Sequence, residues 1–137
     1  MSDEKLDKII LSRDSNDEAI VNIPQLVLHH SPSGFDFGRN GSGPAELALN
    51  ILEYVLRQQG YTGATEKTMR GTHCFRLAYR LHQRFKEIVI MTAPNEGGAI
   101  SVTVIEEWLE QQREAISADD LKYIDGTLED REDDEDA

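Results

Sequence analysis

The sequence lacks most features that would fix a compartment or a chemistry. Among 137 residues there is one cysteine, Cys74, and a single thiol cannot form an intramolecular disulfide, which indicates a reducing, cytoplasmic setting. No run approaches the ~20 apolar residues of a membrane span, and the polar start MSDEKLDKIILSRD argues against a signal peptide. Basic residues are few: 14 Lys and Arg against 26 Asp and Glu give a net charge of −12. We therefore do not expect nucleic acid to bind through the overall field, and any anion site must be local.

The usual signatures of catalysis and metal binding are also missing. Ser42 does not lie in a G-x-S-x-G elbow, and its glycine-rich surroundings form neither a P-loop nor a dinucleotide-binding motif. Cys74 follows His73 directly, and neighbouring helix residues point about 100° apart, so they cannot pair as nucleophile and base. The histidines have no metal-ligand spacing. We expect a protein that is not an enzyme and has no cofactor and no metal site, with an uncharacterised small enzyme as an alternative.

What is present indicates an α+β fold, a small antiparallel sheet packed against three or four helices. Strands are expected over 8–13, 18–23 and 87–93, the first two as a hairpin, with an extended segment or third strand over 25–30. Helices are expected over 44–59, 73–85, 103–115 and 117–126. Long polar loops are expected over 31–43 and 60–72. The single domain is expected to cover 7–126, between a flexible N-terminus, 1–6, and a disordered acidic tail, 127–137.

The first predicted helix carries a polar stripe. Glu46, Asn50, Glu53 and Arg57 recur at helical spacing, and the last two are placed for an i,i+4 ion pair. Gly43 is the expected N-cap, with the neighbouring proline at the first helical position and Glu46 in the first turn. Apolar residues cover the rest of the helix, so most of it is expected to be buried.

The glycine-rich loop before this helix is the first candidate site. Its candidate ligand-binding residues are Arg39, Asn40, Gly41, Ser42 and Gly43. Consecutive backbone N–H groups at a helix start can hold a phosphate or carboxylate, and glycine lets the anion approach closely. The alternative is a structural turn that is anchored to the core by the phenylalanines just before it.

A row of arginines is the second candidate site. Arg76, Arg80 and Arg84 recur every four residues on the second predicted helix. The segment 57–86 holds seven basic residues and one acid, a net charge of +6, so the rest of the chain carries −18. Three arginines on one face repel each other unless something negative lies opposite. That could be acids of the same chain, including the tail, an acidic partner, or an anionic ligand.

The stretch HHSPSGFDFGRNGSGPAELALNIL resembles a family of small proteins, mostly of unknown function, from bacteria, phages and plasmids. The family pattern is found at His30, Ser31, Pro32, Gly34, Phe35, Phe37, Gly38, Gly41, Ser42, Gly43 and Pro44. The resemblance extends over about residues 5–112, with a second family-like segment at 82–90 and a weaker match at the Trp108–Leu109 pair. Where the family usually has Trp-Gly-Tyr, this chain has Phe-Gly-Arg at 37–39. The family has no established activity, so the resemblance implies a fold unit and a phage-like or mobile-element setting.

Together these features predict a non-catalytic binding protein. The expected ligand is a nucleotide, a phosphate or a host protein partner, and an anionic ligand would be held between the glycine loop and the arginine face. An acidic protein that mimics nucleic acid is the alternative binding class. No membrane association is expected, and homo-oligomerisation is left open.

Overall fold

The computed structural model describes residues 5–30 and 34–126, and it confirms the α+β class. Its main sheet has three antiparallel strands in the order β2-β1-β5, with β1 at Lys8–Arg13, β2 at Ala19–Val21 and β5 at Gly98–Ser101. A second, two-stranded sheet pairs β3, Thr65–Lys67, with β4, His73–Phe75. The predicted acidic tail and most of the predicted flexible N-terminus lie outside the described residues.

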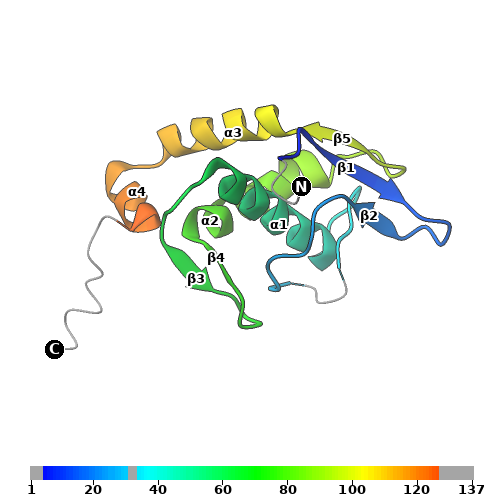
Figure 1. Ribbon diagram of the computed structural model, residues 1–137, viewed down its shortest axis with the longest axis horizontal. Coiled ribbons are helices and arrows are strands. Elements are labelled where there is room, and N and C mark those ends of the chain that lie inside the picture. The colour runs from blue at the N-terminus through cyan, green and yellow to red at the C-terminus, as the bar shows by residue number, and fades with distance from the viewer. Residues whose placement is uncertain (1–4, 31–33, 127–137) are drawn as a thin grey trace.

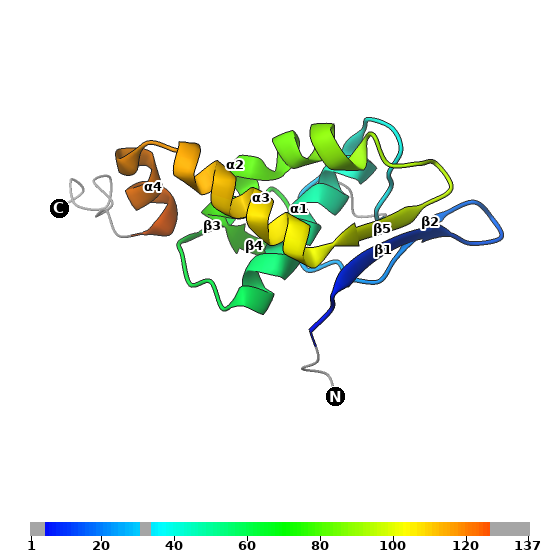
Figure 2. The same ribbon diagram turned by 90° about the horizontal axis from the view of Figure 1, so that it is seen from above.

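Residues 5–30 and 34–126 contain four α-helices. They are α1, Ser42–Gln59; α2, Arg76–Phe85, which continues into a π-helical turn, η1, at Lys86–Ile90; α3, Val102–Ala115; and α4, Ala118–Asp125. The three-stranded sheet lies at one end of the molecule and α4 at the other (Figure 1, Figure 2). Among the described residues, no helix has the length and apolarity needed to cross a bilayer.

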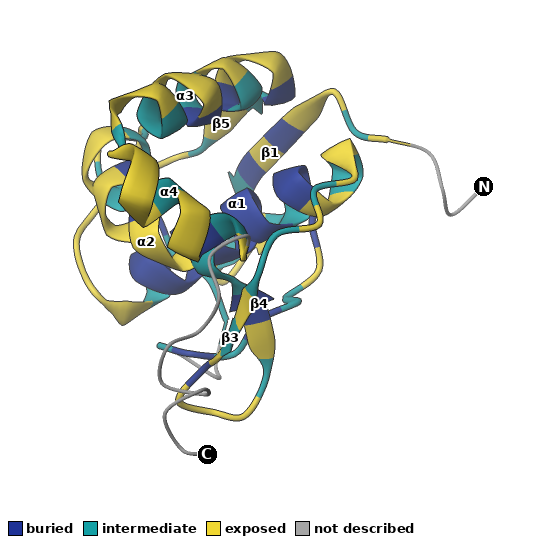
Figure 3. Ribbon diagram, turned by 90° about the vertical axis from the view of Figure 1, so that its left-hand side faces the viewer, coloured by how far each residue is buried: buried dark blue, intermediate teal, exposed yellow. Residues whose placement is uncertain are grey.

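The core is built around α1. Twelve of its 18 residues are buried, so it packs on several sides, as its broad apolar surface predicts. Figure 3 shows α1 largely buried, whereas much of α3 and α4 is exposed. The sheet contributes alternate residues of its central strand, because successive side chains point to opposite faces: Ile9 and Leu11 are buried and Ile10 is exposed.

The hairpin of the first two strands is confirmed, but the third strand was wrongly placed. The predicted strand over 87–93 is instead η1 and a turn, and β5 pairs with β1 from Lys8↔Ser101 to Leu11↔Gly98. A short apolar run fits a buried strand or a buried helical turn equally well. Here Phe85 and Ile90 are both buried on the continuing helix, and this burial decides in favour of helix.

The second predicted helix also starts later than expected. Residues 73–75 form β4, and the preceding polar loop contains β3, so Thr72 does not cap a helix. Cys74 is buried as predicted, but from a strand. Helix propensity does not separate these states, because pairing with β3 supplies the backbone hydrogen bonds that a first helical turn would otherwise make.

Other helix starts differ by a few residues. Gly41, with a φ of 137°, is the N-cap of α1, so Gly43 lies inside the helix and Glu46 lies beyond its first turn. Ser101 caps α3 by accepting a hydrogen bond from the Val104 N–H. The fourth helix is confirmed, with Ser117 as its N-cap and a left-handed glycine at its end.

Candidate functional site

In the structure, the glycine loop already contains a carboxylate. Asp36 Oδ2 lies 3.0 Å from Arg39 Nε, and Asp36 Oδ1 lies 3.4 Å from Arg13 Nη2. At the helix start, the Gly41 N–H donates to Asn40 Oδ1 at 2.8 Å. A Cβ added to Gly43 would lie 2.8 Å from the Asp36 Cβ, so glycine is needed here for close packing against that residue. The carboxylate of Asp36 thus lies beside the loop that was predicted to bind an anion.

Arg13 organises this region. In the sequence it is a lone cation at the end of a strand, and nothing there predicts this role. Its side chain is only 8% exposed. It donates to the carbonyl oxygens of Asn95 at 2.6 Å and Phe37 at 3.1 Å, and its guanidinium lies 4.3 Å from the centroid of the Phe37 ring. Arg13 therefore ties β1 to the loop before α1 and to the turn before β5.

A broad surface pocket of about 590 Å³ adjoins this loop. Its charged lining consists of Arg13, Asp17, Glu18, Asp36 and Arg39, which is three acids against two guanidinium groups. Both guanidinium groups are engaged by Asp36. An anion entering here would meet a net negative lining, so this pocket beside the predicted nest is poorly suited to an anionic ligand.

The arginines of α2 are unevenly engaged. Arg76 lies 3.4 Å from Glu66, donates to the Tyr123 carbonyl at 2.9 Å and stacks 4.1 Å from the Tyr123 ring centroid. Arg80 lies 3.4 Å from Asp120, and both side chains are about half exposed. Arg84 is exposed and makes no ion pair within the described part of the chain.

The structure does not join the two predicted half-sites into one cleft. Arg76 and Arg80 contact residues of β3 and α4, whereas the glycine loop bonds to Ile90 through the Gly38 N–H and contacts Asn95. Figure 1 shows α4 and the loop before α1 in opposite halves of the molecule. An anion cannot bridge the loop and the first two arginines in this arrangement.

The polar stripe of α1 is buried rather than exposed. Glu46 is 0% exposed, and its carboxylate accepts hydrogen bonds from the backbone N–H groups of His29 and His30 and from the Gln25 side chain. Asn50, also 0% exposed, accepts from the Val27 N–H at 2.8 Å and donates to the carbonyl oxygen of the same residue at 3.0 Å. These side chains replace the strand partner that segment 25–30 lacks, which explains why this segment is extended without being a strand.

Glu53, the next residue of the stripe, supports the second sheet. It forms the predicted pair with Arg57 at 2.9 Å, and its other oxygen accepts from the Phe75 N–H at 2.9 Å. Glu53 is only 1% exposed. The carboxylate therefore satisfies the last residue of β4, where the chain turns into α2.

Segment 25–30 meets α2 through a cluster of histidines. His30 Nε2 lies 2.8 Å from His82 Nε2, and His82 Nδ1 lies 2.6 Å from the Tyr79 carbonyl oxygen. A carbonyl only accepts, so His82 Nδ1 carries a proton. In the neutral pair, His30 Nε2–H then donates to His82 Nε2. Only one proton fits between the two Nε2 atoms, so these rings cannot both be charged without separating.

Burial reinforces this neutral state. Desolvation, followed by the nearby His30 and His29, lowers the pKa of His82 to about 4, although its bond to the Tyr79 carbonyl acts in the opposite direction. Desolvation and His29 lower the pKa of His30, against the raising effect of Glu46. Both rings are therefore uncharged near neutral pH, and no sequence spacing indicated their contact.

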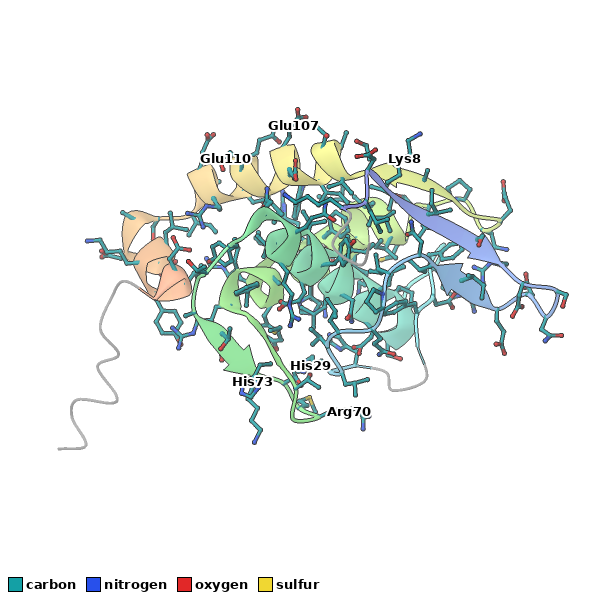
Figure 4. All side chains as sticks on the ribbon, viewed as in Figure 1. Lys8, His29, Arg70, His73, Glu107 and Glu110 are labelled. Atoms are coloured by element: carbon teal, nitrogen blue, oxygen red, sulfur yellow. The ribbon has the colours of Figure 1, made fainter. Side chains whose placement is uncertain are left out.

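A second pocket, of about 280 Å³, lies between the β3–β4 hairpin and α2. We call it the hairpin pocket, and its lining is His29, Glu66, Lys67, Thr68, Met69, Cys74 and Tyr79. Figure 4 shows His29, Arg70 and His73 gathered at this side of the molecule, with Glu107 and Glu110 of α3 on the opposite side. The structure thus places Arg70 and His73 on one face of the molecule and two exposed acids of α3 on another, where Lys8 also lies.

We call the first of these the hairpin face, formed by Lys67, Arg70 and His73, all of them exposed. Lys86, at the end of α2, adds a further positive charge close enough to lower the pKa of His30 and His82. Sequence analysis counted Lys67, Arg70 and Lys86 in the basic segment, but selected only the arginines of the second helix as candidate ligand-binding residues. The loop residues were missed because only the hairpin brings them together beside His29.

No curated protein and no solved structure matches the chain. The model of a family of unknown function, DUF6166, matches residues 6–72, which extend from just before β1 to the loop before β4. The match includes the glycine loop and α1, and it ends before residues 82–90 and Trp108, where the resemblance was expected to continue. The predicted resemblance to a family of unknown function is therefore confirmed over residues 6–72.

Proposed function

We propose that the protein is a non-catalytic binding module of phage or mobile-element type that holds an anionic partner on its hairpin face. The observation that carries the proposal is the separation of charge in space on a chain whose net charge is −12. Arg70 lies at the hairpin, on the other side of the molecule from Glu107 and Glu110 of α3 (Figure 4), and Lys67 is an exposed residue of β3. A local positive field on an acidic protein attracts anions to one face only.

The engaged arginines support this choice of face over the glycine loop. Arg39 is neutralised by Asp36, and Arg76 and Arg80 are paired with Glu66 and Asp120. A guanidinium that already has a carboxylate partner offers less to a ligand. Of the predicted arginines, Arg84 has the best access to a partner, because it is exposed and makes no ion pair among residues 5–30 and 34–126.

Isothermal titration calorimetry tests the proposal. The full chain is titrated with inorganic tripolyphosphate at about 50 and at about 200 mM salt. Arg70→Glu should weaken binding at low salt, and Lys8→Glu is the matched control. Lys8 is also exposed, and the change in charge is the same, but it lies away from the hairpin (Figure 4). Absence of binding, or an equal loss in both variants, would reject the hairpin face.

A second candidate, the mimicry of nucleic acid, is favoured by the acids of α3. Glu107, Glu110 and Glu114 are exposed along one helix, as in a regular row of negative charges. Such a protein would bind a basic partner with its acidic face. Glu107→Lys should then abolish capture of a nucleic-acid-binding partner, whereas Arg70→Glu should leave it unchanged.

A further inference from the structure

We propose that the hairpin pocket binds a nucleotide unit, with the base against Tyr79 and Met69 and a phosphate toward Lys67. This inference rests on the proposed function, because it names the class of anion that the hairpin face would hold. The pocket volume of about 280 Å³ lies near the lower end of the range for small-ligand pockets, roughly 300–1,000 Å³. A single base with its sugar is a ligand of suitable size for such a pocket.

The apolar wall is exposed to an unusual degree. Met69 is 84% exposed and Tyr79 is 43% exposed, although both line the same pocket. Tyr79 is held in place by its neighbours, because its ring packs edge-on against His29 at 5.2 Å and lies 5.1 Å from the His82 ring. A fixed aromatic ring beside a flexible thioether offers a surface on which a planar base can stack.

His29 supplies a directed hydrogen-bond donor. The residue is only 8% exposed, and its Nδ1 accepts the Met69 N–H at 3.0 Å. In the neutral imidazole the proton must then lie on Nε2. Within the described residues no hydrogen-bond partner is found for that Nε2–H, and His29 lines the pocket. Although the His29 side chain is largely buried, its Nε2 atom remains accessible at the pocket wall, so this donor is open to a ligand that carries an acceptor, such as a base edge or a phosphate oxygen.

The charges around the pocket favour an anion over a neutral aromatic compound. Lys67 lines the pocket and Arg70 follows in the same hairpin turn. Glu66 is the one acid in the lining, and it is paired with Arg76 at 3.4 Å, so its charge is offset within the protein. Because a cation, Lys67, and an aromatic ring, Tyr79, line the same pocket, it has the two elements that recognise single-stranded nucleic acid or a free nucleotide.

The experiment compares three probes on the full chain: adenosine triphosphate, inorganic tripolyphosphate and a fluorescent oligothymidylate. Tyr79→Leu removes the ring and Tyr79→Phe keeps it, so the pair isolates stacking. We expect Tyr79→Leu to weaken binding of adenosine triphosphate or oligothymidylate roughly tenfold, with Tyr79→Phe and tripolyphosphate binding nearly unchanged. Met69→Ala changes a mostly exposed residue of the same pocket wall and does not disturb the core. If Tyr79→Leu does not fold, the effect of Met69→Ala on the binding of the three probes decides whether the apolar wall contacts a base.

Each outcome has a distinct meaning. Tighter binding of adenosine triphosphate identifies a free nucleotide as the ligand, and tighter binding of oligothymidylate identifies a single strand. If tripolyphosphate binds as tightly as both and neither Tyr79→Leu nor Met69→Ala changes any affinity, the nucleotide inference is wrong while the proposed anion-binding function stands. If none of the three probes binds, both are wrong.

Discussion

Helices α1 and α2 carry polar residues at similar spacing but use them in opposite ways. On α1, Glu46 and Asn50 are inaccessible to solvent and bind the backbone of a neighbouring segment. On α2, Arg80 and Arg84 are exposed, and Arg80 meets Asp120 at the surface. The difference shows that helical polarity alone does not reveal which face meets solvent. The decisive factor is whether the facing segment has unsatisfied backbone groups.

The largest expected effect comes from removing the buried carboxylate of α1. Glu46→Ala leaves two buried backbone N–H groups and the Gln25 amide without their acceptor, and we expect a loss of about 4 kcal/mol in the free energy of unfolding. Chemical denaturation measures this loss. Glu107→Ala, the same substitution at an exposed helical site, should cost less than about 0.5 kcal/mol. Similar losses in the two variants would contradict the structural role of Glu46.

The second prediction changes one atom of the same stripe. Asn50→Asp replaces an amide that donates to the carbonyl oxygens of Val27 and Glu46 with a group that cannot donate when ionised, and we expect it to cost about 3 kcal/mol. Asn40→Asp is the control, because the exposed Asn40 side chain only accepts, from the Gly41 N–H, and an aspartate keeps that bond. Denaturation midpoints that shift equally would show that Asn50 does not donate to these carbonyl groups.

The third prediction concerns the histidine contact between segment 25–30 and α2. The unfolded chain protonates His82 near pH 6.5, and the folded protein only near pH 4, so the unfolded state binds more protons between these values. Stability should therefore fall as the pH drops from about 6.5 to about 4, by about 3 kcal/mol from this residue. Thermal unfolding against pH measures the slope.

His82→Gln should flatten this slope, since glutamine does not titrate. His73→Gln, the same change at an exposed histidine, should keep the wild-type slope. If the slopes of the two variants cannot be distinguished, the buried pair does not control the pH dependence.

The smallest effects are expected on the arginines of α2. Arg76→Ala removes a stacking contact with Tyr123 and a hydrogen bond to its carbonyl, and should cost about 1 to 2 kcal/mol. Arg80→Ala removes a half-exposed pair with Asp120 and should cost about 0.5 kcal/mol or less. Addition of salt should reduce the second loss further. If Arg80→Ala and Arg76→Ala lower the free energy of unfolding equally, the Arg80–Asp120 pair is stronger than expected for two half-exposed side chains.

Local patterns predicted a large part of the fold. Alternation and turn residues placed the first hairpin, and apolar periodicity with Gly60 and Ser117 placed α1 and α4 within about two residues. The prediction placed a strand at 87–93, where the chain forms a helical turn, and missed the strand at 98–101, because strand pairing is a long-range contact. Residues 8–11 and 98–101 are adjacent in space only in the folded chain.

The candidate site was less predictable than the fold. The sequence indicated that the cations are concentrated in segment 57–86, but not which of them already have a partner. Asp36 engages Arg39 three residues along the same loop, and Asp120 engages Arg80 from 40 residues away, a contact that no spacing rule can show. The hairpin pocket was missed for the same reason, since His29 and Tyr79 come from separate segments.

By itself, the sequence determined the quantities that depend on composition or on a few neighbouring residues. These are the charge balance, the helix ends at left-handed glycines, the apolar surface of α1 and its Glu53–Arg57 pair. Only the tertiary structure decided that the carboxylate of Glu46 is buried, that His30 and His82 share one proton, and that Arg70 lies on the opposite side of the molecule from Glu107 and Glu110 (Figure 4). Local properties follow from bonds and rotations within one or two turns of chain. Burial, pairing and proton sharing depend on which distant backbone and side-chain groups the fold brings within a few ångströms.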